Sequence, residues 1–359
     1  MDKSSLVQAL KLAKPALGVS TLIAGVDCFF FDKNKVTAYN GSLAIVSDLG
    51  FDFPVTGWIN GNTFFKLLNE LGNDVSLSVS GHGENRTLLV KSGSTRAQFP
   101  ALALNGALFN PTASSSRDTI LPRSALFLNG IKKCMFSLSS KGINTDEAGI
   151  HLFIEDDNCE LFATNGATTS KYSFSISGAG EDVDRIPKRY STLLPAPFCE
   201  QLSFLFSELL SCPDEVAIST GEDQHIRAIF PKTSLYSSFY ATNAQTQVKV
   251  RFESAVMDTP VVPVPKGLVD AIHRAEIVIG DNPLEINYGQ QLNLQATGGA
   301  GVGHIEETME SRYQADGQIR TKAKHLGKVL SSCAAIGFTD EYILLEGADK
   351  SFSHIIHGE

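Results

Sequence analysis

The sequence of 359 residues lacks the features that mark membrane, secreted and disulfide-rich proteins. No apolar run approaches the roughly 20 residues needed to span a bilayer. The beginning, MDKSSLVQALKLAKPAL, holds no unbroken apolar stretch and no small-residue cleavage site, so we expect no signal peptide. The six cysteines form no CxxC pair, which favours reduced thiols buried as small apolar groups. We therefore expect a protein of the cytoplasm.

Catalytic and metal-binding signatures are also missing. The eight histidines show neither HxH nor HExxH spacing, so a zinc site would lack ligands. There is no GxSxG motif and no Walker A lysine, and the serines and cysteines have no local base beside them. The acidic run at 155–157 falls in an expected hairpin turn and is interpreted as a solvated loop. We predict a protein that is not an enzyme and that binds no metal or cofactor.

The composition is that of a globular protein large enough for two or three domains. Hydrophobic residues make up 43% of the chain and aromatic residues 9%, which suffices for real cores. The net charge of −9 argues against indiscriminate nucleic-acid binding. A local basic surface is still compatible with this charge.

A turn recurs three times along the chain. In each copy a strand ends in Ala, a tight turn follows, and a second alternating strand begins. The turns are AYNGS at 38–42, ATNGA at 163–167 and ATGGA at 296–300. Asn-Gly and Gly-Gly suit such turns because both central positions can adopt positive φ. The recurrence indicates an internal repeat.

Helical segments recur with the same period. Apolar residues at helical spacing, followed by a break and alternating strands, begin at Asn62, Pro197 and Lys322. An earlier helical segment precedes each turn, at 4–17, 123–138 and 265–279. Breaks rich in Pro, Ser or polar residues separate the copies, at 109–119 and 252–265. We predict an α+β fold of three similar domains, at 1–115, 116–255 and 256–359.

Several segments together resemble the bacterial DNA sliding clamp, the ring-forming beta subunit of the replicative DNA polymerase. INGNTFFKLLNEL to LLVKSGSTRAQFPAL resembles its first-domain helix and the strands after it. LFIEDDNCELFATNGATTS resembles the second-domain strands, and HLGKVLSSC with YILLEGADKSFSHII resembles the end of the third domain. The resemblance covers essentially the whole chain. It implies that each domain has two helices lining a ring interior and small antiparallel sheets outside. It also implies that two chains join head to tail as a homodimer around duplex DNA.

The glycine-rich stretch LQATGGAGVGHIEE at 294–307 has to be distinguished from a phosphate-binding loop. A dinucleotide fingerprint requires a strand, G-x-G-x-x-G, and then a helix whose N-terminus holds the phosphates. Here Gly299, Gly301 and Gly303 give G-x-G-x-G, and the HIEETMESRY that follows is too polar and too short for a packed helix. We interpret the stretch as the third copy of the repeated turn. A nucleotide-dependent enzyme is therefore the least favoured alternative.

The helical segments carry an excess of basic residues. With the last segment starting at Gln318, they hold twelve basic residues, Arg320 among them, and five acidic ones. The resemblance implies that these helices face DNA, where basic side chains would contact phosphates weakly and without reading bases. The predicted DNA-facing residues are Lys11, Lys14, Lys66, Arg123, Lys132, Lys133, Lys266, Arg274, Lys322, Lys324 and Lys328.

The resemblance also implies a pocket between domains two and three that holds short peptides of polymerases and repair enzymes. Its walls would be Thr164, Gly166, Ala167, Thr169, Ile355, Ile356, His357 and Gly358. Ala167 and Thr169 replace bulky turn residues, and Glu147 stands where an apolar residue is expected. No Pro- and Arg-containing segment is recognisable at 234–247, and the tail HIIHGE lacks an apolar finish. Because a hydrophobic anchor would bury less area here, we predict a shallower or differently tuned pocket.

The sequence thus predicts a DNA polymerase processivity factor. Such a clamp would encircle duplex DNA without sequence preference and tether the polymerase and the clamp loader through short peptides, with no membrane partner. One alternative remains open, a clamp-like scaffold or decoy that binds replication proteins without encircling DNA. The sequence does not identify the client proteins, nor whether the gene is cellular or from a phage.

Overall fold

The computed structural model describes residues 2–19, 24–83, 85–103, 108–109, 118–120, 124–138, 148–176, 189–209, 216–220, 225–238, 245–257, 259–299 and 303–359. Within them the chain is α+β, and the paired strands are antiparallel. None of the described helices is long and apolar enough to cross a membrane. The chain divides into two compact units: Met1–Ser124 with Asp182–Ile186 and Glu200–Phe239, and Ala125–Glu181 with Pro187–Cys199 and Tyr240–Glu359.

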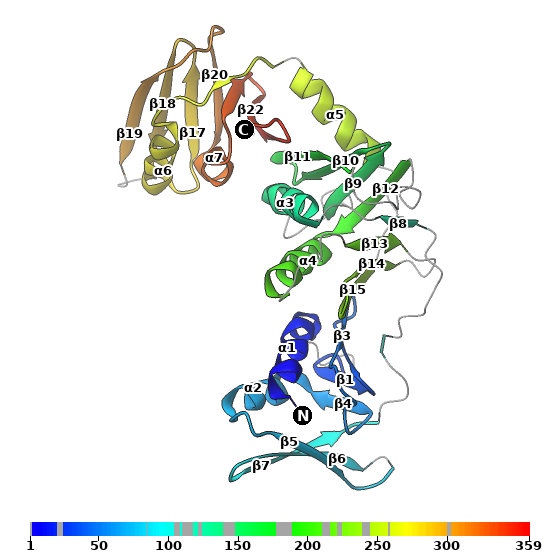
Figure 1. Ribbon diagram of the computed structural model, residues 1–359. Coiled ribbons are helices and arrows are strands. Elements are labelled where there is room, and N and C mark those ends of the chain that lie inside the picture. Colours follow the sequence, from blue (N-terminus) through cyan, green and yellow to red (C-terminus); the bar gives the residue numbers. More distant parts are fainter. Residues whose placement is uncertain are drawn as a thin grey trace. The chain divides into compact units, whose positions relative to one another are not determined.

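The first unit contains an eight-stranded sheet and a three-stranded sheet (Figure 1). The larger sheet has the strand order β4-β1-β2-β3-β15-β14-β13-β8. Its strands are β1 (Cys28–Asp32), β2 (Lys35–Tyr39), β3 (Leu43–Asp48), β4 (Gly57–Asn60), β8 (Asp118–Ile120), β13 (Ala217–Thr220), β14 (His225–Ile229) and β15 (Thr233–Ser238). The smaller sheet consists of β5 (Ser76–Ser80), β6 (Arg86–Ser92) and β7 (Thr95–Ala101). A bridge between Trp58 and Leu102 connects β4 to the end of β7.

Two helices of the first unit pack on this framework. The first is α1 (Lys3–Ala13), which continues as a 3-10 turn at Lys14–Ala16, and the second is α2 (Gly61–Glu70). The Asp2 carboxylate accepts hydrogen bonds from the backbone N–H groups of Ser4 and Ser5, so it caps the first turn of α1. Leu6 and Leu10 of α1 are fully buried, as their helical spacing predicts. α1 therefore presents its opposite face to solvent.

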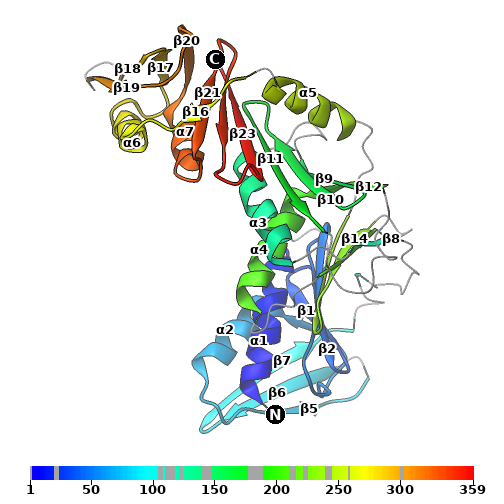
Figure 2. The ribbon, with the colours of Figure 1, turned by 45° about the horizontal axis from the view of Figure 1, so that its top comes forward.

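The second unit also contains one eight-stranded sheet and one smaller sheet (Figure 2). The larger has the order β12-β9-β10-β11-β23-β22-β21-β16. Its strands are β9 (Gly149–Glu155), β10 (Asn158–Thr164), β11 (Thr168–Ser175), β12 (Arg189–Pro195), β16 (Val262–Pro263), β21 (Ala335–Phe338), β22 (Tyr342–Glu346) and β23 (Phe352–His357). The smaller sheet has the order β19-β18-β17-β20. It consists of β17 (Pro283–Tyr288), β18 (Gln291–Thr297), β19 (His304–Glu310) and β20 (Gly317–Lys322).

Helices of the second unit lie on both faces of its eight-stranded sheet. The helices of this unit are α3 (Ser124–Cys134), α5 (Gln245–Met257), α6 (Leu268–Ile279) and α7 (Ala323–Leu330). Only Ser124 of α3 belongs to the first unit, and a 3-10 turn at Met135–Ser137 continues this helix. The helix α4 (Ala196–Glu208) begins in this unit, and its residues from Glu200 onward belong to the first. Leu161 of β10 lies below α3, whereas Phe162, the next residue, packs against α5. Because successive strand residues point to opposite faces, α3 and α5 cover opposite sides of the sheet (Figures 1 and 2).

Two copies of the repeated turn are confirmed in atomic detail, those at 38–42 and 163–167. In the first copy the side-chain oxygen of Asn40 accepts the N–H groups of Ser42 and Leu43, and in the second that of Asn165 accepts those of Ala167 and Thr168. The following glycines, Gly41 and Gly166, have φ of 101° and 80°. The same side-chain-to-backbone bonds thus recur at both copies. The repeated element order, a helix, strands, a helix and more strands, occurs three times.

The glycine-rich stretch is a strand connection, as the sequence indicates. The N–H of Gly298 donates to the carbonyl of Gly303 over 2.8 Å, and β19 follows at once. No helix begins at Gly303, so its backbone N–H groups are not arranged as a helix N-terminus that could hold phosphate. Gly301 lies outside the described residues.

Three expectations about the secondary structure were wrong. The last helix does not start at Gln318: Gly317–Lys322 is strand β20, so Arg320 and Lys322 lie on a strand. Lys266 precedes α6, which begins at Leu268. The helix α5 (Gln245–Met257) was not expected at all, and its second half falls in the predicted break at 252–265.

The sheets are larger than the small sheets of the expected domains. β3 pairs with β15 and β11 pairs with β23, so strands of successive repeats share one sheet. The division into domains at 1–115, 116–255 and 256–359 stays a prediction. Arg123 and Glu147 lie outside the described residues.

Candidate functional site

In the first unit, the predicted DNA-facing lysines project from the helices to solvent. Lys11 of α1, Lys14 of the following turn and Lys66 of α2 are all exposed. Lys11 forms an ion pair with Glu208, which neutralises part of its charge. The ammonium of Lys14 lies 4.9 Å from the ring centroid of Phe65 and has no ion pair to a described residue. Among the predicted DNA-facing residues described in this unit, Lys14 and Lys66 therefore remain available to phosphates.

In the second unit, the predicted cations fall into two groups. Lys132 is exposed at the end of α3, and the ammonium of Lys133 beside it lies 4.9 Å from the ring centroid of Phe352. Lys328 is exposed on α7, and Lys266 is exposed just before α6. These four lysines have no ion pair to a described residue, so they can attract an anion.

The other predicted cations already have carboxylate partners. Arg274 of α6 donates two hydrogen bonds of 2.6 Å to the carboxylate of Glu307 on β19. This bidentate contact raises the pKa of Arg274 and turns its guanidinium toward the sheet. The remaining pairs are Lys322 with Glu359 at 3.3 Å and Lys324 with Asp281. These three cations would have to give up a carboxylate before they could contact DNA.

The structure brings the two predicted walls of the peptide pocket together. Thr164, Gly166 and Ala167 form the turn between β10 and β11, and Thr169 of β11 pairs with Ile355 of β23. The N–H of His357 donates to the carbonyl of Ala167 over 2.9 Å. The two segments are thus adjacent strands of one sheet. Ile356 points to the face opposite Ile355 and is fully buried.

The helix α5 covers the apolar part of this region. Ile355 is 2% exposed and belongs to a buried cluster with Phe162, Leu344 and Phe252, the last from α5. Half-buried apolar residues of α5 pack around the same cluster: Val248, Ala255 and Val256. The side chain of Ile355, which a hydrophobic peptide anchor would contact, is therefore already covered by α5 of the same chain.

Polar contacts hold both ends of α5. The carboxylate of Glu160 on β10 forms ion pairs with Lys171 at 2.7 Å and with Lys249 of α5 at 2.5 Å. Burial would raise the pKa of Glu160, but the hydrogen bonds from the two lysines outweigh it and lower the pKa. At the other end, Tyr342 donates its hydroxyl hydrogen to the carbonyl of Ala255 over 2.8 Å. The helix is thus fixed by both charge and packing.

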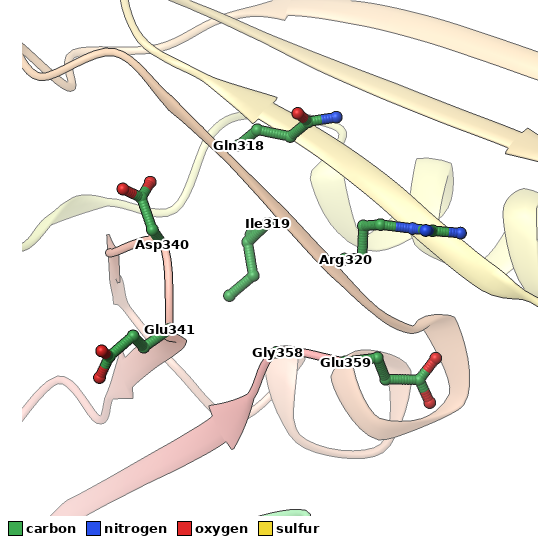
Figure 3. A pocket seen from close by; sticks show the side chains of 7 residues that line it. All are labelled: Gln318, Ile319, Arg320, Asp340, Glu341, Gly358 and Glu359. Carbon is green, nitrogen blue, oxygen red and sulfur yellow. The ribbon is translucent and has the colours of Figure 1, made fainter.

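A cavity of about 400 Å³ lies beside the end of β23 (Figure 3). Of the predicted pocket residues, Gly358 lines it, and the N–H of Gly358 donates to the carbonyl of Glu341 over 2.7 Å. Figure 3 shows the carboxylates of Asp340, Glu341 and Glu359 around this cavity, with Ile319 between them. The lining carries these three carboxylates and the guanidinium of Arg320, and such a charged lining does not suit a purely hydrophobic anchor.

Sequence reasoning missed the contribution of α5 to this region. Val248, Phe252, Ala255 and Val256 follow the i, i+4, i+7, i+8 spacing of one helix face, and this was the available signal. The ion pairs of Arg274, Lys322 and Lys324 had no such signal, because their partners lie on other elements.

The strands, helices and repeated turns described above define the sliding-clamp fold. Solved DNA polymerase sliding clamps from Pseudomonas aeruginosa and Bacillus subtilis each match with a TM-score of 0.82, at 17% and 16% identity, over 100% of this chain and 98% of theirs. The DNA polymerase III beta subunit of Thermotoga maritima matches with a TM-score of 0.81 at 14% identity, over the same shares.

At the level of sequence, neither a scan against protein-family models nor a search of the curated proteins finds a match. The likeness to the solved clamps therefore establishes the fold of this chain. The sequence has diverged far from theirs.

Proposed function

We propose that the protein is a DNA polymerase processivity factor, a homodimeric ring that encircles duplex DNA and tethers replication proteins. The full-length match to the sliding-clamp fold carries this proposal. Such a ring holds DNA topologically, so it needs no catalytic group and no base-specific contact. Its place is the cytoplasm, at the nucleoid.

The exposed lysines support a weak contact with DNA. Of the predicted DNA-facing lysines, Lys14, Lys66, Lys132, Lys266 and Lys328 are exposed and have no ion pair to a described residue, and Lys133 is half-buried and also has none. An ammonium group attracts phosphate as a point charge and does not read bases. Contacts of this kind weaken steeply with salt and let a protein slide along DNA.

Two open sheet edges support a head-to-tail dimer. β19 is the outermost strand of its sheet in the second unit, and β5 is the outermost strand of the three-stranded sheet in the first. Such edges present unpaired backbone groups that another chain can extend. Ile277 of α6, next to β19 in the fold, is 70% exposed. Its large apolar side chain is the kind that a partner covers.

Charge supports the same pairing of edges. Lys91 of β6 and Arg96 of β7 lie directly opposite each other and are both exposed. Like charges opposite each other destabilise a sheet, unless an anion lies nearby. β19 carries Glu306 and Glu310. A second chain that pairs β19 with β5 would place these carboxylates two strands from Lys91, where their attraction for the basic residues of this sheet acts over a longer distance.

Two measurements test the proposed dimeric ring. Light scattering behind size exclusion should give a mass near twice 38.7 kDa. The ring should also stay on a nicked circular duplex and slide off once the duplex is linearised. Ile277→Arg should give monomers that are not retained on the nicked circular duplex. Val250→Arg changes a 59% exposed residue of α5 and should stay dimeric. Equal retention on circular and linear DNA would contradict encirclement. A wild-type monomer that binds replication proteins would favour the non-encircling scaffold.

A third measurement tests the lysines. The logarithm of the DNA-binding constant falls linearly with the logarithm of the salt concentration. Changing Lys66, Lys132 and Lys328 together to Gln should make this slope shallower by about one unit per lost phosphate contact. The matched control changes Lys33, Lys35 and Lys232, which are exposed on or beside strands of the first unit. An equal effect of both triple changes would show that the helices have no special role.

A further inference from the structure

The helix α5 buries fewer side chains than α6 and α7, the helices that follow it in the second unit. Phe252 is 3% exposed and is the one buried side chain among those of α5 that the structure describes. Val248, Ala255 and Val256 are half-buried, and Val250 is 59% exposed. By contrast, α6 buries five residues and α7 buries four. Because burial of apolar surface is the main force that docks a helix, α5 is the one of these three helices that another segment could replace most easily.

The surface beneath α5 consists of apolar side chains that need a cover. Phe162, Leu344 and Ile355 are 2% exposed or less and form one buried cluster with Phe252 of α5. The half-buried Phe153 packs against the same cluster. Without α5 these side chains would form one exposed apolar patch, and such patches mark sites that other proteins cover. We call this surface of Phe153, Phe162, Leu344 and Ile355 the α5 docking face.

Three aromatic rings meet where α5 lies on its docking face. The rings of Phe153 and Phe162 are edge to face, with centroids 5.6 Å apart, and Phe252 stands edge to face on Phe162 at 5.7 Å. Such contacts add to the free energy that burial of a ring supplies. The sheet provides two of these rings and the helix provides the third. An aliphatic side chain in the place of Phe252 would be buried but would lose the ring contact, so the face favours an aromatic anchor.

Glu160 adds a charge requirement to the docking face. It lies on the same face of β10 as Phe162 and is 7% exposed. Its carboxylate pairs with Lys171 of the neighbouring strand β11 at 2.7 Å and with Lys249 of α5 at 2.5 Å. The ammonium of Lys249 also lies 5.6 Å from the ring centroid of Phe153. A nearly buried carboxylate that loses one of its two cations is destabilised, so a cover of this face has to bring a cation with it.

We propose that this face is a docking site for an amphipathic helix of a partner protein, and that α5 occupies the site until such a helix displaces it. The partner helix carries a cation and, three residues later, an aromatic anchor, as Lys249 and Phe252 do in α5. Helices that lie on an apolar site are recognised through anchors three, four and seven residues apart, and α5 has this spacing in Val248, Phe252 and Ala255. The docking face shares Ile355 with the predicted peptide pocket and contains none of the predicted DNA-facing residues. The proposal therefore does not depend on the proposed ring around DNA.

A synthetic peptide with the sequence of α5, QTQVKVRFESAVM, serves as the partner helix. In the wild type the docked α5 competes with this peptide. Phe252→Ala should raise the undocked population about 100-fold, and the apparent affinity of the site for a second helix rises by the same factor. Fluorescence anisotropy should therefore show that Phe252→Ala binds the labelled peptide about 100-fold more tightly than the wild type does. Val250→Ala truncates an exposed residue of α5, so it is the matched control and should bind like the wild type. Equal binding by all three proteins, or no binding by any of them, would overturn the proposal.

Changed peptides test the chemistry of the site. A peptide with Phe252→Leu keeps an apolar anchor without the ring and should bind Phe252→Ala protein about fivefold more weakly. A peptide with Lys249→Gln should bind about tenfold more weakly, because it loses a hydrogen bond to a nearly buried carboxylate. Adding Glu160→Gln to the protein should remove this second difference. A Leu peptide that binds as tightly as the Phe peptide, or a Lys249 effect that survives Glu160→Gln, would contradict the assigned roles.

Hydrogen exchange of the wild type tests the displacement itself, and it remains informative even if Phe252→Ala fails to fold. An excess of isotope-labelled peptide should accelerate exchange within 245–257 of the protein, while β10 and β23 keep the protection that their pairing provides. Unchanged exchange at millimolar peptide would overturn the proposal. Assemblies in a mixture of wild type and Phe252→Ala that are larger than those of either protein alone would make α5 of a second copy the occupant, and this result would contradict the proposal as well.

Discussion

Replacing Phe252 by Ala should release α5 from the second unit without unfolding the sheet beneath it. Phe252 is 3% exposed and is the one buried side chain among the described side chains of α5. Truncating a buried Phe to Ala costs about 3–5 kcal/mol. Val248, Ala255 and Val256 of α5 are only half-buried, and Val250 and Met257 are exposed. The packing of this helix thus depends on one ring.

The size of the effect follows from that dependence. A helix of 13 residues is marginal in water without tertiary contacts. A loss of about 3 kcal/mol raises the undocked population by a factor of about 100, because each 1.4 kcal/mol is tenfold. The ion pair between Lys249 and Glu160 is present in both proteins, so it does not enter the difference between them. Amide exchange within 245–257 should therefore accelerate about 100-fold.

Hydrogen exchange read by mass spectrometry measures this change directly. Peptides covering α5 should lose protection, while peptides covering β10 and β23 keep theirs, because those strands stay paired within the sheet. Val250→Ala is the control, since it truncates a 59% exposed residue of the same helix. Unchanged exchange in Phe252→Ala, or an equal loss of protection throughout the sheet, would refute the reasoning.

Further predictions concern stability. Gly130→Ala in α3 should destabilise by about 1–3 kcal/mol, since the new Cβ would lie 2.5 Å from Leu161 Cδ1. Gly327→Ala in α7 should stabilise the folded protein by up to about 1 kcal/mol, because the nearest atom to its new Cβ is Glu276 Oε2 at 3.3 Å. Thermal melts of the two variants measure both changes. The free energy of unfolding of the wild type should fall as pH falls from 6.5 toward 3, because the folded state keeps His354 neutral. Denaturant titrations should show that this free energy depends less on pH in His354→Phe. Glu160→Gln should destabilise at pH 7, and this difference should shrink below pH 4.5 in the same titrations, because the folded state lowers the Glu160 pKa.

The repeated local features could be predicted because they depend on neighbouring residues. The turns at Asn40 and Asn165 follow from Asn-Gly, where the Asn side chain bonds to the backbone two and three residues on. The faces of α1 follow from its apolar spacing. The pairing of β3 with β15 does not follow from any such signal. An alternating strand shows which residues are buried, but not which distant strand it joins.

The errors at the candidate site have specific physical causes. In QIRTKAKHLGKVL, the alternating burial of Ile319 and Thr321 runs directly into the helix that starts at Ala323, so strand and helix periods overlap. The apolar face of α5 was hard to recognise in the sequence, because the Ser, Thr and β-branched residues around it are typical of loops or strands. The partners of the predicted cations depend on tertiary packing. Arg274 fits a solvated helix face by its spacing, yet its guanidinium bonds to β19.

The position of β23 also has a consequence for synthesis on the ribosome. β23 lies inside its sheet, between β11 and β22, and its residue His354 bonds to Ser170 of β11, 184 residues earlier. At translation rates of roughly 5–20 residues per second, β11 waits about 10–40 s for its neighbour to be made. During this time the nascent chain carries an unpaired strand edge that can join another nascent chain. Slowing translation after β11 should therefore increase aggregation, and a chaperone that covers open edges should suppress it.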